Sequence, residues 1–169
     1  MKALVCNEFA TVDKLNLEEI PAPQPAKGEV LIDVKAAGVN FPDLLTVQGK
    51  YQIKPPLPFI PGTEVAGVVT AVGESVTRRK VGDKVIATTQ IGGFAEECVA
   101  PEYATIEMAE SMSFPQAAGF SITYGTSYYA LKQRANLQAG ETVLVLGAAG
   151  GVGIATIQIA KAMGAKVKI

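Results

Sequence analysis

The stretch that decides the fold is residues 143–169, VLVLGAAGGVGIATIQIAKAMGAKVKI. It starts with a β-branched, apolar run of the length of a short strand. Four glycines then fall between residues 147 and 153, and the apolar residues that follow recur at the 3.6-residue period of a helix. Gly164 stands where a glycine ends a helix. This order predicts a strand, a tight turn, a helix within residues 151–164 and the start of a second strand.

The same stretch allows a second interpretation, because residues 143–160 carry no charge and have the length of a membrane span. Four glycines in the middle would weaken such a single helix. They suit a turn between a strand and a helix, and the turn is therefore the favoured interpretation.

The glycine turn has the pattern of a dinucleotide-binding loop. Residues 148–153, AAGGVG, follow G-x-G-x-x-G with alanine at the first glycine. Gly150 would let the backbone approach a pyrophosphate, and Gly153 would let the helix pack on the strand. The helix N-terminus would then face the phosphates. The candidate cofactor-binding residues here are Ala149, Gly150, Gly151, Val152 and Gly153. The alternative is a tight turn that binds nothing.

The first two-thirds of the chain has a different character. Short β-branched or alternating segments predict strands, and Gly67 and Gly73 suggest a bend in one of them. Many short strands with Gly/Pro punctuation are typical of a barrel or sandwich. Helical segments follow at 113–120 and 121–137. The expected strand segments are 2–6, 29–39, 64–76, 81–87 and 94–100.

Composition excludes several kinds of chemistry. The chain has 169 residues, 49% of them hydrophobic, a net charge of −1 and no histidine. Without histidine it cannot contain a Ser–His–Asp or Cys–His set or a histidine-containing zinc site. The net charge supplies no basic field, so we expect neither nucleic acid nor a membrane as partner. Cys6 and Cys98 are too few for a disulfide framework and are interpreted as small core residues. The N-terminus has no signal or transit pattern, which favours a cytoplasmic location.

Four segments together resemble the quinone oxidoreductase/zeta-crystallin family of zinc-independent medium-chain dehydrogenases/reductases. They are GETVLVLGAAGGVGIATIQIAK at 140–161, AAGVNFPDLL at 36–45, PFIPGTEVAGVVTAVGESV at 58–76 and VGDKVIA at 81–87. The resemblance implies a β-rich GroES-like barrel domain over residues 1–120, followed by the start of an α/β Rossmann domain over 121–169. It also implies NADPH as cofactor and hydride transfer to a quinone or an activated alkene or carbonyl.

The resemblance further implies site residues. Asn40, Asp43 and Tyr51 match polar positions that line the family's active-site cleft, and Thr126 matches a threonine that lies against the cofactor. An asparagine amide could donate to a carbonyl oxygen or hold the nicotinamide ribose, and a tyrosine could donate a proton. Structural roles are the alternatives. Asn40 precedes Phe41-Pro42-Asp43 as a helix N-cap would, Tyr51 could cover the core, and the Thr126 hydroxyl could be satisfied within a helix.

The resemblance also indicates that no metal is bound. Zinc-dependent relatives carry a cysteine where this chain has Asn40, and Gly-His-Glu where it has residues 62–64, Gly-Thr-Glu. Both differences remove a metal ligand.

The acidic residue that would distinguish NAD from NADP is expected ~20 residues beyond the glycine loop, at or past Ile169. The choice of NADPH therefore comes from the resemblance alone. One hypothesis is a truncated reductase, whose strand at 143–146 pairs with another copy to form a homo-oligomer. Two further hypotheses are an enoyl-thioester reductase and a non-catalytic GroES-like binding module.

Overall fold

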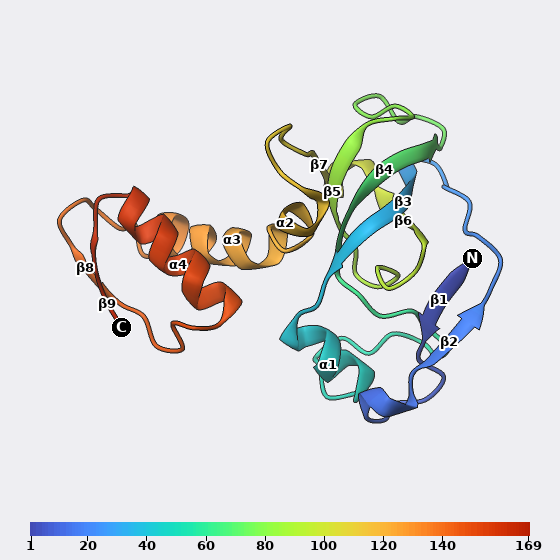
Figure 1. Cartoon of the computed structure of the whole chain (residues 1–169), viewed down its shortest axis with the longest axis horizontal. Coiled ribbons are helices and arrows are strands. Elements are labelled where there is room, and N and C mark those ends of the chain that lie inside the picture. Colours follow the sequence, from blue (N-terminus) through green and yellow to red (C-terminus); the bar gives the residue numbers. More distant parts are fainter. The chain divides into compact units, whose positions relative to one another are not determined.

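The computed structural model describes residues 1–169, and the chain forms two compact units, Met1–Gly119 and Phe120–Ile169 (Figure 1). The first unit is rich in strands and the second alternates helices with two short strands. The assignment of residues 1–120 and 121–169 to two family domains stays a prediction, because compact units are defined by contacts and not by descent.

An antiparallel sheet dominates the first unit, with the strand order β6-β3-β4-β5-β7. The expected strand segments of the sheet are confirmed, with ends that differ by a few residues. The three-residue β7 was not expected, and it is too short to show a periodicity. The strands are β3 (Glu29–Gly38), β4 (Glu64–Val72), β5 (Lys84–Thr88), β6 (Glu97–Pro101) and β7 (Thr105–Glu107).

The two faces of this sheet bury different sets of side chains, as the two-residue period of a strand requires. Val65 and Val85 belong to the main core, whereas their neighbours Ala66 and Ile86 pack on the other face with helix α2 (Phe114–Ala118). The main core consists of Val30, Ile32, Val65, Val69, Val85, Ala87, Cys98 and Ala100.

Gly67 lies where β3 and β4 approach each other closely. A Cβ atom at this position would lie 2.2 Å from the carbonyl oxygen of Asp33, and the register of β3 against β4 shifts beside it, between Val34 and Ala36. A bend was expected at Gly67, and the structure shows a shift of the strand register beside it. Strand β4 ends at Val72, so Gly73 lies just outside the strand and not at a bend within it.

Helix α1 (Phe41–Val47) and strands β1 (Lys2–Val5) and β2 (Asn16–Glu19) complete the first unit with the short helices η1 (Val12–Lys14) and η2 (Glu102–Ala104). A small cluster of Cys6, Val47 and Phe59 joins β1 to α1. Cys6 and Cys98 are both buried, which confirms their interpretation as core residues. Strand β2 carries mostly exposed residues, and its sequence was not recognised as a strand.

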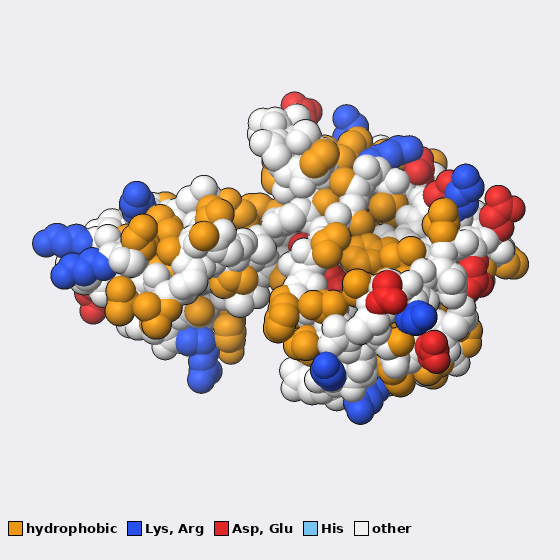
Figure 2. Space-filling model, turned by 60° about the horizontal axis from the view of Figure 1, so that its bottom comes forward, with side chains coloured by type: hydrophobic (Ala, Val, Ile, Leu, Met, Phe, Trp, Pro, Cys, Tyr) orange, Lys and Arg blue, Asp and Glu red, His pale blue; other side chains and the backbone are white.

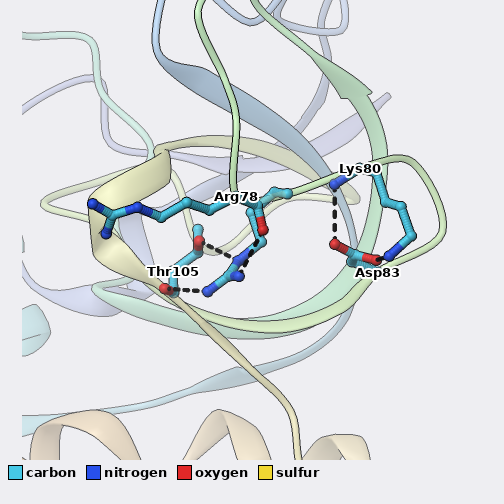
Figure 3. A network of polar contacts seen from close by, with 5 residues as sticks. Arg78, Lys80, Asp83 and Thr105 are labelled. Atoms are coloured by element: carbon cyan, nitrogen blue, oxygen red, sulfur yellow. Dashed lines mark hydrogen bonds and ion pairs between the residues drawn. The ribbon is translucent and has the colours of Figure 1, made fainter.

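Polar contacts stabilise the connection between β4 and β5, residues 73–83 (Figure 3). Arg79 donates from Nε to Thr105 Oγ1 and from Nη2 to the Thr105 carbonyl, both at 2.9 Å. Lys80 Nζ lies 2.7 Å from Asp83 Oδ1. The carboxylate of Glu102 accepts the backbone N–H groups of Thr77 and Arg78. The basic run at residues 78–80 therefore serves largely to fix this connection.

The second unit is a β–α–β arrangement with a preceding helix. Helix α3 (Ser121–Tyr128) continues as the π-helical segment Tyr129–Arg134, so the helix expected over 121–137 is present but changes its hydrogen bonding midway. The expected strand, turn, helix and second strand are confirmed as β8 (Thr142–Leu144), α4 (Gly151–Ala162) and β9 (Lys166–Lys168), with β8 parallel to β9.

The core of this unit contains Leu131, Leu137 and Ala160. Gly164 has φ +81°, as expected of a glycine that ends a helix. None of the helices in the chain combines the length and the apolar composition that crossing a membrane requires.

Candidate active site and cofactor loop

Asn40 occupies the N-cap of helix α1, and Pro42 lies in the first turn. The Asn40 N–H donates to Asp43 Oδ2 at 2.8 Å, and the Asp43 N–H returns a bond of 3.0 Å to the Asn40 carbonyl. Such reciprocal bonds satisfy amides that have no partner inside a helix. The expected N-cap role of Asn40 is therefore confirmed, and its proposed contact with a ligand stays a prediction.

A second contact ties Asn40 to the sheet. Its side-chain Nδ2 donates to Oε1 of Glu64 at 2.9 Å. Glu64 is the first residue of β4 and is 1% exposed. The sequence interpretation considered Glu64 only within the segment that replaces a zinc ligand, and missed this contact. The sequence feature that could have indicated this contact is the position of Glu64 directly before the apolar run VAGVV, where a charged side chain is unusual.

Asp43 is a buried carboxyl group. Its side chain is 3% exposed, and Oδ1 has no hydrogen bond of standard geometry. Burial raises the pKa of Asp43, and the Asn40 amide, the Thr63 hydroxyl and the Gly62 amide oppose this rise in the pKa. The structure thus brings Asn40, Asp43 and Glu64 together at the start of α1.

Tyr51 lies just beyond the end of the same helix. Its backbone N–H donates to the Leu45 carbonyl at 3.2 Å, and its side chain is half-buried. No hydrogen bond joins its hydroxyl to Asn40 or Asp43. The hydroxyl is therefore not part of the cluster at the start of α1.

The glycine loop joins β8 to α4. Gly147 has φ +70°, a left-handed conformation that favours glycine. The Gly150 N–H closes a turn onto the Gly147 carbonyl at 3.0 Å, and Gly150 is the N-cap of α4. At Gly153 a Cβ atom would lie 2.4 Å from the Gly147 carbonyl oxygen and 2.8 Å from Ala148 Cα. Only glycine lets the helix approach the loop this closely. The sequence predicted a close approach at Gly153 to the strand, and the structure shows it to the loop that follows the strand.

A hollow of about 480 Å³ opens above this loop. Gly150, Gly151, Val152 and Gly153 line it, together with Thr156, which the sequence interpretation did not select. The residues of the first turn also supply N–H groups that have no acceptor inside the helix. These features suit a pyrophosphate. The other lining residues are Leu144, Val145, Leu146 and Gly147.

Two predicted cofactor residues lie elsewhere in the second unit. Ala149 is exposed at the tip of the loop, and Thr126 is exposed on α3. Neither is among the residues that line the hollow. Their contact with a cofactor stays a prediction.

Ser127, next to Thr126, is a buried residue with 1% exposure. Its Oγ lies 2.8 Å from the Thr123 carbonyl and 3.1 Å from the Val152 carbonyl, and it accepts a hydrogen bond from Thr156 Oγ1 at 3.0 Å. The sequence interpretation missed Ser127, since contact between α3 and α4 depends on how the two helices pack.

Formal charge is distributed unevenly between the two units. Residues 120–169 contain five basic residues and one acidic residue, Glu141, which gives a net charge of +4. Residues 1–119 hold the other ten basic and fifteen acidic residues, a net charge of −5. Basic side chains accordingly predominate over the second unit in Figure 2. The five are Lys132, Arg134, Lys161, Lys166 and Lys168.

No group of three or more His, Cys, Asp or Glu side chains is arranged to hold a metal ion. In particular, the cluster at the start of α1 combines two carboxyl groups with an amide, and the amide donates to one of them.

The fold and the loop define a class of protein: a GroES-like domain followed by the start of a Rossmann domain. The profile of the alcohol dehydrogenase GroES-like domain matches residues 26–130. The chain is 46% identical over 172 residues to a quinone oxidoreductase-like protein 2 homolog of Nematostella vectensis, covering 98% of this chain and 46% of that protein. It is 43% identical over 169 residues to human quinone oxidoreductase, covering 99% of this chain and 51% of that protein.

The chain belongs to the alcohol dehydrogenase GroES-like family, and the relatives that it resembles include quinone oxidoreductases. It spans about half the length of the curated relatives it matches.

Solved structures agree with this assignment. The quinone oxidoreductase of Thermus thermophilus, which was also solved in complex with NADPH, has a TM-score of 0.87 at 38% identity, covering 99% of this chain and 52% of that one. The CurK enoyl reductase has a TM-score of 0.90 at 34% identity, covering 98% of this chain and 52% of that one.

Proposed function

We propose that this chain forms part of an NADPH-dependent, zinc-independent oxidoreductase that reduces a quinone or an activated alkene or carbonyl. The observation that carries the proposal is the glycine loop, whose Gly153 admits no side chain and whose hollow opens at the start of α4. The sequence identity of the chain to quinone oxidoreductases supports the class of reaction.

The second unit would hold the cofactor, which supplies the hydride when bound. Gly151 and Val152 would direct backbone N–H groups at the pyrophosphate, in the field of the helix N-terminus. The net charge of +4 on this unit favours an anionic dinucleotide. The NADPH complex of the Thermus relative is the basis for choosing NADPH.

The first unit would orient the reacting groups. Asn40 is held at the start of α1 by Asp43 and Glu64, so its amide has a fixed position. Tyr51 has a hydroxyl that is not bonded to Asn40 or Asp43 and could give a proton to the reduced oxygen. We propose that these residues work without a metal, since Asn40 and Thr63 stand where zinc-dependent relatives carry a cysteine and a histidine.

The proposal is tested by mixing the 169-residue chain with NADPH and 9,10-phenanthrenequinone. We expect the fluorescence of NADPH to change on binding and its absorbance to fall as the quinone is reduced. A chain that changes neither signal is not the proposed enzyme, and a non-catalytic GroES-like module would then be the better description. Tyr51→Phe should lower kcat, and an unchanged rate would reject Tyr51 as proton donor.

An enoyl-thioester reductase is the second candidate, and similarity to the CurK enoyl reductase favours it. The two reactions are distinguished by offering the chain a quinone and a crotonyl thioester in parallel. Faster NADPH oxidation with the thioester would favour the second candidate. The expected homo-oligomer stays a prediction, which sedimentation velocity over a range of concentrations would test.

A further inference from the structure

Glu64 is a buried residue that takes no direct part in the proposed hydride and proton transfers. It is 1% exposed, yet it accepts a hydrogen bond of 2.9 Å from Asn40 Nδ2. Burying a charged group is costly unless hydrogen bonds compensate it, and an apolar side chain would fill the same place at lower cost. The contact with Asn40 is therefore the feature to explain.

The surroundings of Glu64 restrict its orientation. The strand register places Gly38 of β3 opposite Glu64 of β4. A Cβ atom on Gly38 would lie 2.4 Å from Glu64 Oε1 and 2.7 Å from its Cγ. The glycine thus makes the space that the carboxylate fills on its way to Asn40.

We propose that Glu64 is a positioning residue that fixes the orientation of the Asn40 amide, and with it the atom that this amide offers to a ligand. This inference rests on the proposed function. A carboxylate can only accept hydrogen bonds, so the Nδ2 end of the amide must face Glu64. The Asp43 carboxylate holds the backbone of Asn40 at 2.8 Å, so the main chain and the side chain are both held.

The chemistry of Asn40 follows from this orientation. One of its two side-chain N–H donors is already used, and donation to a negative charge polarises the amide and strengthens its oxygen as an acceptor. Asn40 therefore receives a hydrogen bond from a donor, such as a ribose hydroxyl of the cofactor.

The chain contains a matched pair outside the site. Asn7 Nδ2 donates to Glu18 Oε1 at 2.6 Å on the exposed surface. Glu18→Gln removes the same charge from the same kind of contact, so it is the control for Glu64→Gln. Both variants are made in the full 169-residue chain.

Each variant is measured in two ways. NMR follows the side-chain ¹⁵N–¹H₂ signals of the asparagines, and steady-state kinetics with 9,10-phenanthrenequinone gives kcat and the KM for NADPH. In Glu64→Gln we expect the Asn40 signals to move and the KM for NADPH to rise about tenfold, with a smaller change in kcat. In Glu18→Gln only the Asn7 signals should move. A fall in kcat at unchanged KM would overturn the acceptor role, and unmoved Asn40 signals would overturn the positioning role.

The proposal and the proposed function can fail separately. A wild-type chain without binding or turnover refutes the function, and the Asn40 signals alone then uphold or overturn the contact with Glu64. If Glu64→Gln does not fold, hydrogen exchange in the wild-type chain tests the contact between Glu64 and Asn40. Its Asn40 side-chain protons should exchange with water at least about tenfold more slowly than those of exposed Asn16, and equal exchange would overturn the contact.

Discussion

The hydroxyl of Ser127 on α3 lies 3.1 Å from the backbone oxygen of Val152 on α4. Val152 lines the hollow above the glycine loop, and Ser127 also accepts a hydrogen bond from Thr156, which lines the same hollow. The shape of the candidate cofactor loop is therefore fixed from a neighbouring helix as well as by its own glycines.

Ser127→Ala should destabilise the chain by about 1–3 kcal/mol, because it leaves buried polar groups without their partner. Ser121→Ala is the matched control on the same helix, since the Ser121 hydroxyl is buried and has no hydrogen-bond partner. That substitution should be neutral or stabilising. Urea unfolding of both variants measures the difference, and equal losses would contradict the role given to Ser127.

Gly153→Ala should disrupt the loop, because its methyl group would lie 2.4 Å from the Gly147 carbonyl oxygen. We expect a lower unfolding midpoint and loss of NADPH binding. At Gly125, within α3, a Cβ atom meets nothing within 4 Å. Gly125→Ala should therefore raise stability by about 0.5–1 kcal/mol. Thermal unfolding and NADPH fluorescence follow both, and a well-folded Gly153→Ala chain that binds NADPH normally would count against the close approach.

Asp43→Asn should change how stability depends on pH. Burial raises the pKa of Asp43 above its ordinary value of 3.8, so the folded state favours the neutral carboxyl. The corresponding stability is present below pH 3.8 and is lost as the pH rises through the folded-state pKa. Asp43→Asn should therefore gain stability relative to wild type as the pH rises across this window.

Asp83 provides a control of opposite sign for that experiment. Its hydrogen bond with Lys80 lowers the pKa of Asp83, so its contribution is present above pH 3.8 and disappears in acid. The pair is exposed, and salt should weaken its effect. Urea titrations from pH 3 to pH 7 compare Asp43→Asn with Asp83→Asn. Parallel pH profiles for the two variants would refute the assignment for Asp43.

Both thiols should be unreactive in the folded chain. Burial raises the pKa of Cys98 to about 12 and also raises the pKa of Cys6, so little thiolate is present near neutral pH. Ellman's reagent at pH 8 should label neither cysteine until guanidinium unfolds the chain. A rapid reaction of one thiol in native buffer would show that its site opens.

The parts of the fold that could be predicted are those that depend on residue types and spacing within one short segment. A β-branched run, a group of glycines and a stretch with helical period follow one another, and this order identified β8, the loop and α4. The close approach at Gly153 shows why the pattern needs glycine there. Asn40 before Pro42 and Asp43 predicted the start of α1. The three-residue β7 and the π-helical segment Tyr129–Arg134 have no such pattern, because neighbouring strands and helices determine them.

The missed site residues have a common cause. Glu64 reaches Asn40 across 24 residues of sequence, and Ser127 reaches Val152 across 25. Each contact depends on a strand register or a helix packing that no single segment encodes. Residue types and spacing therefore located the loop and the helix start, whereas the groups that hold them in place emerged only from the structure.

The double use of Asn40, as the cap of α1 and as a candidate ligand contact, has a consequence for directed evolution. A library that varies residue 40 or 43 changes the yield of folded protein and the chemistry of the site together. Screens of crude lysate would then reward variants that express well, whatever their turnover. Selection for new substrates is better started at Tyr51, whose hydroxyl is not bonded to Asn40 or Asp43 at the start of α1.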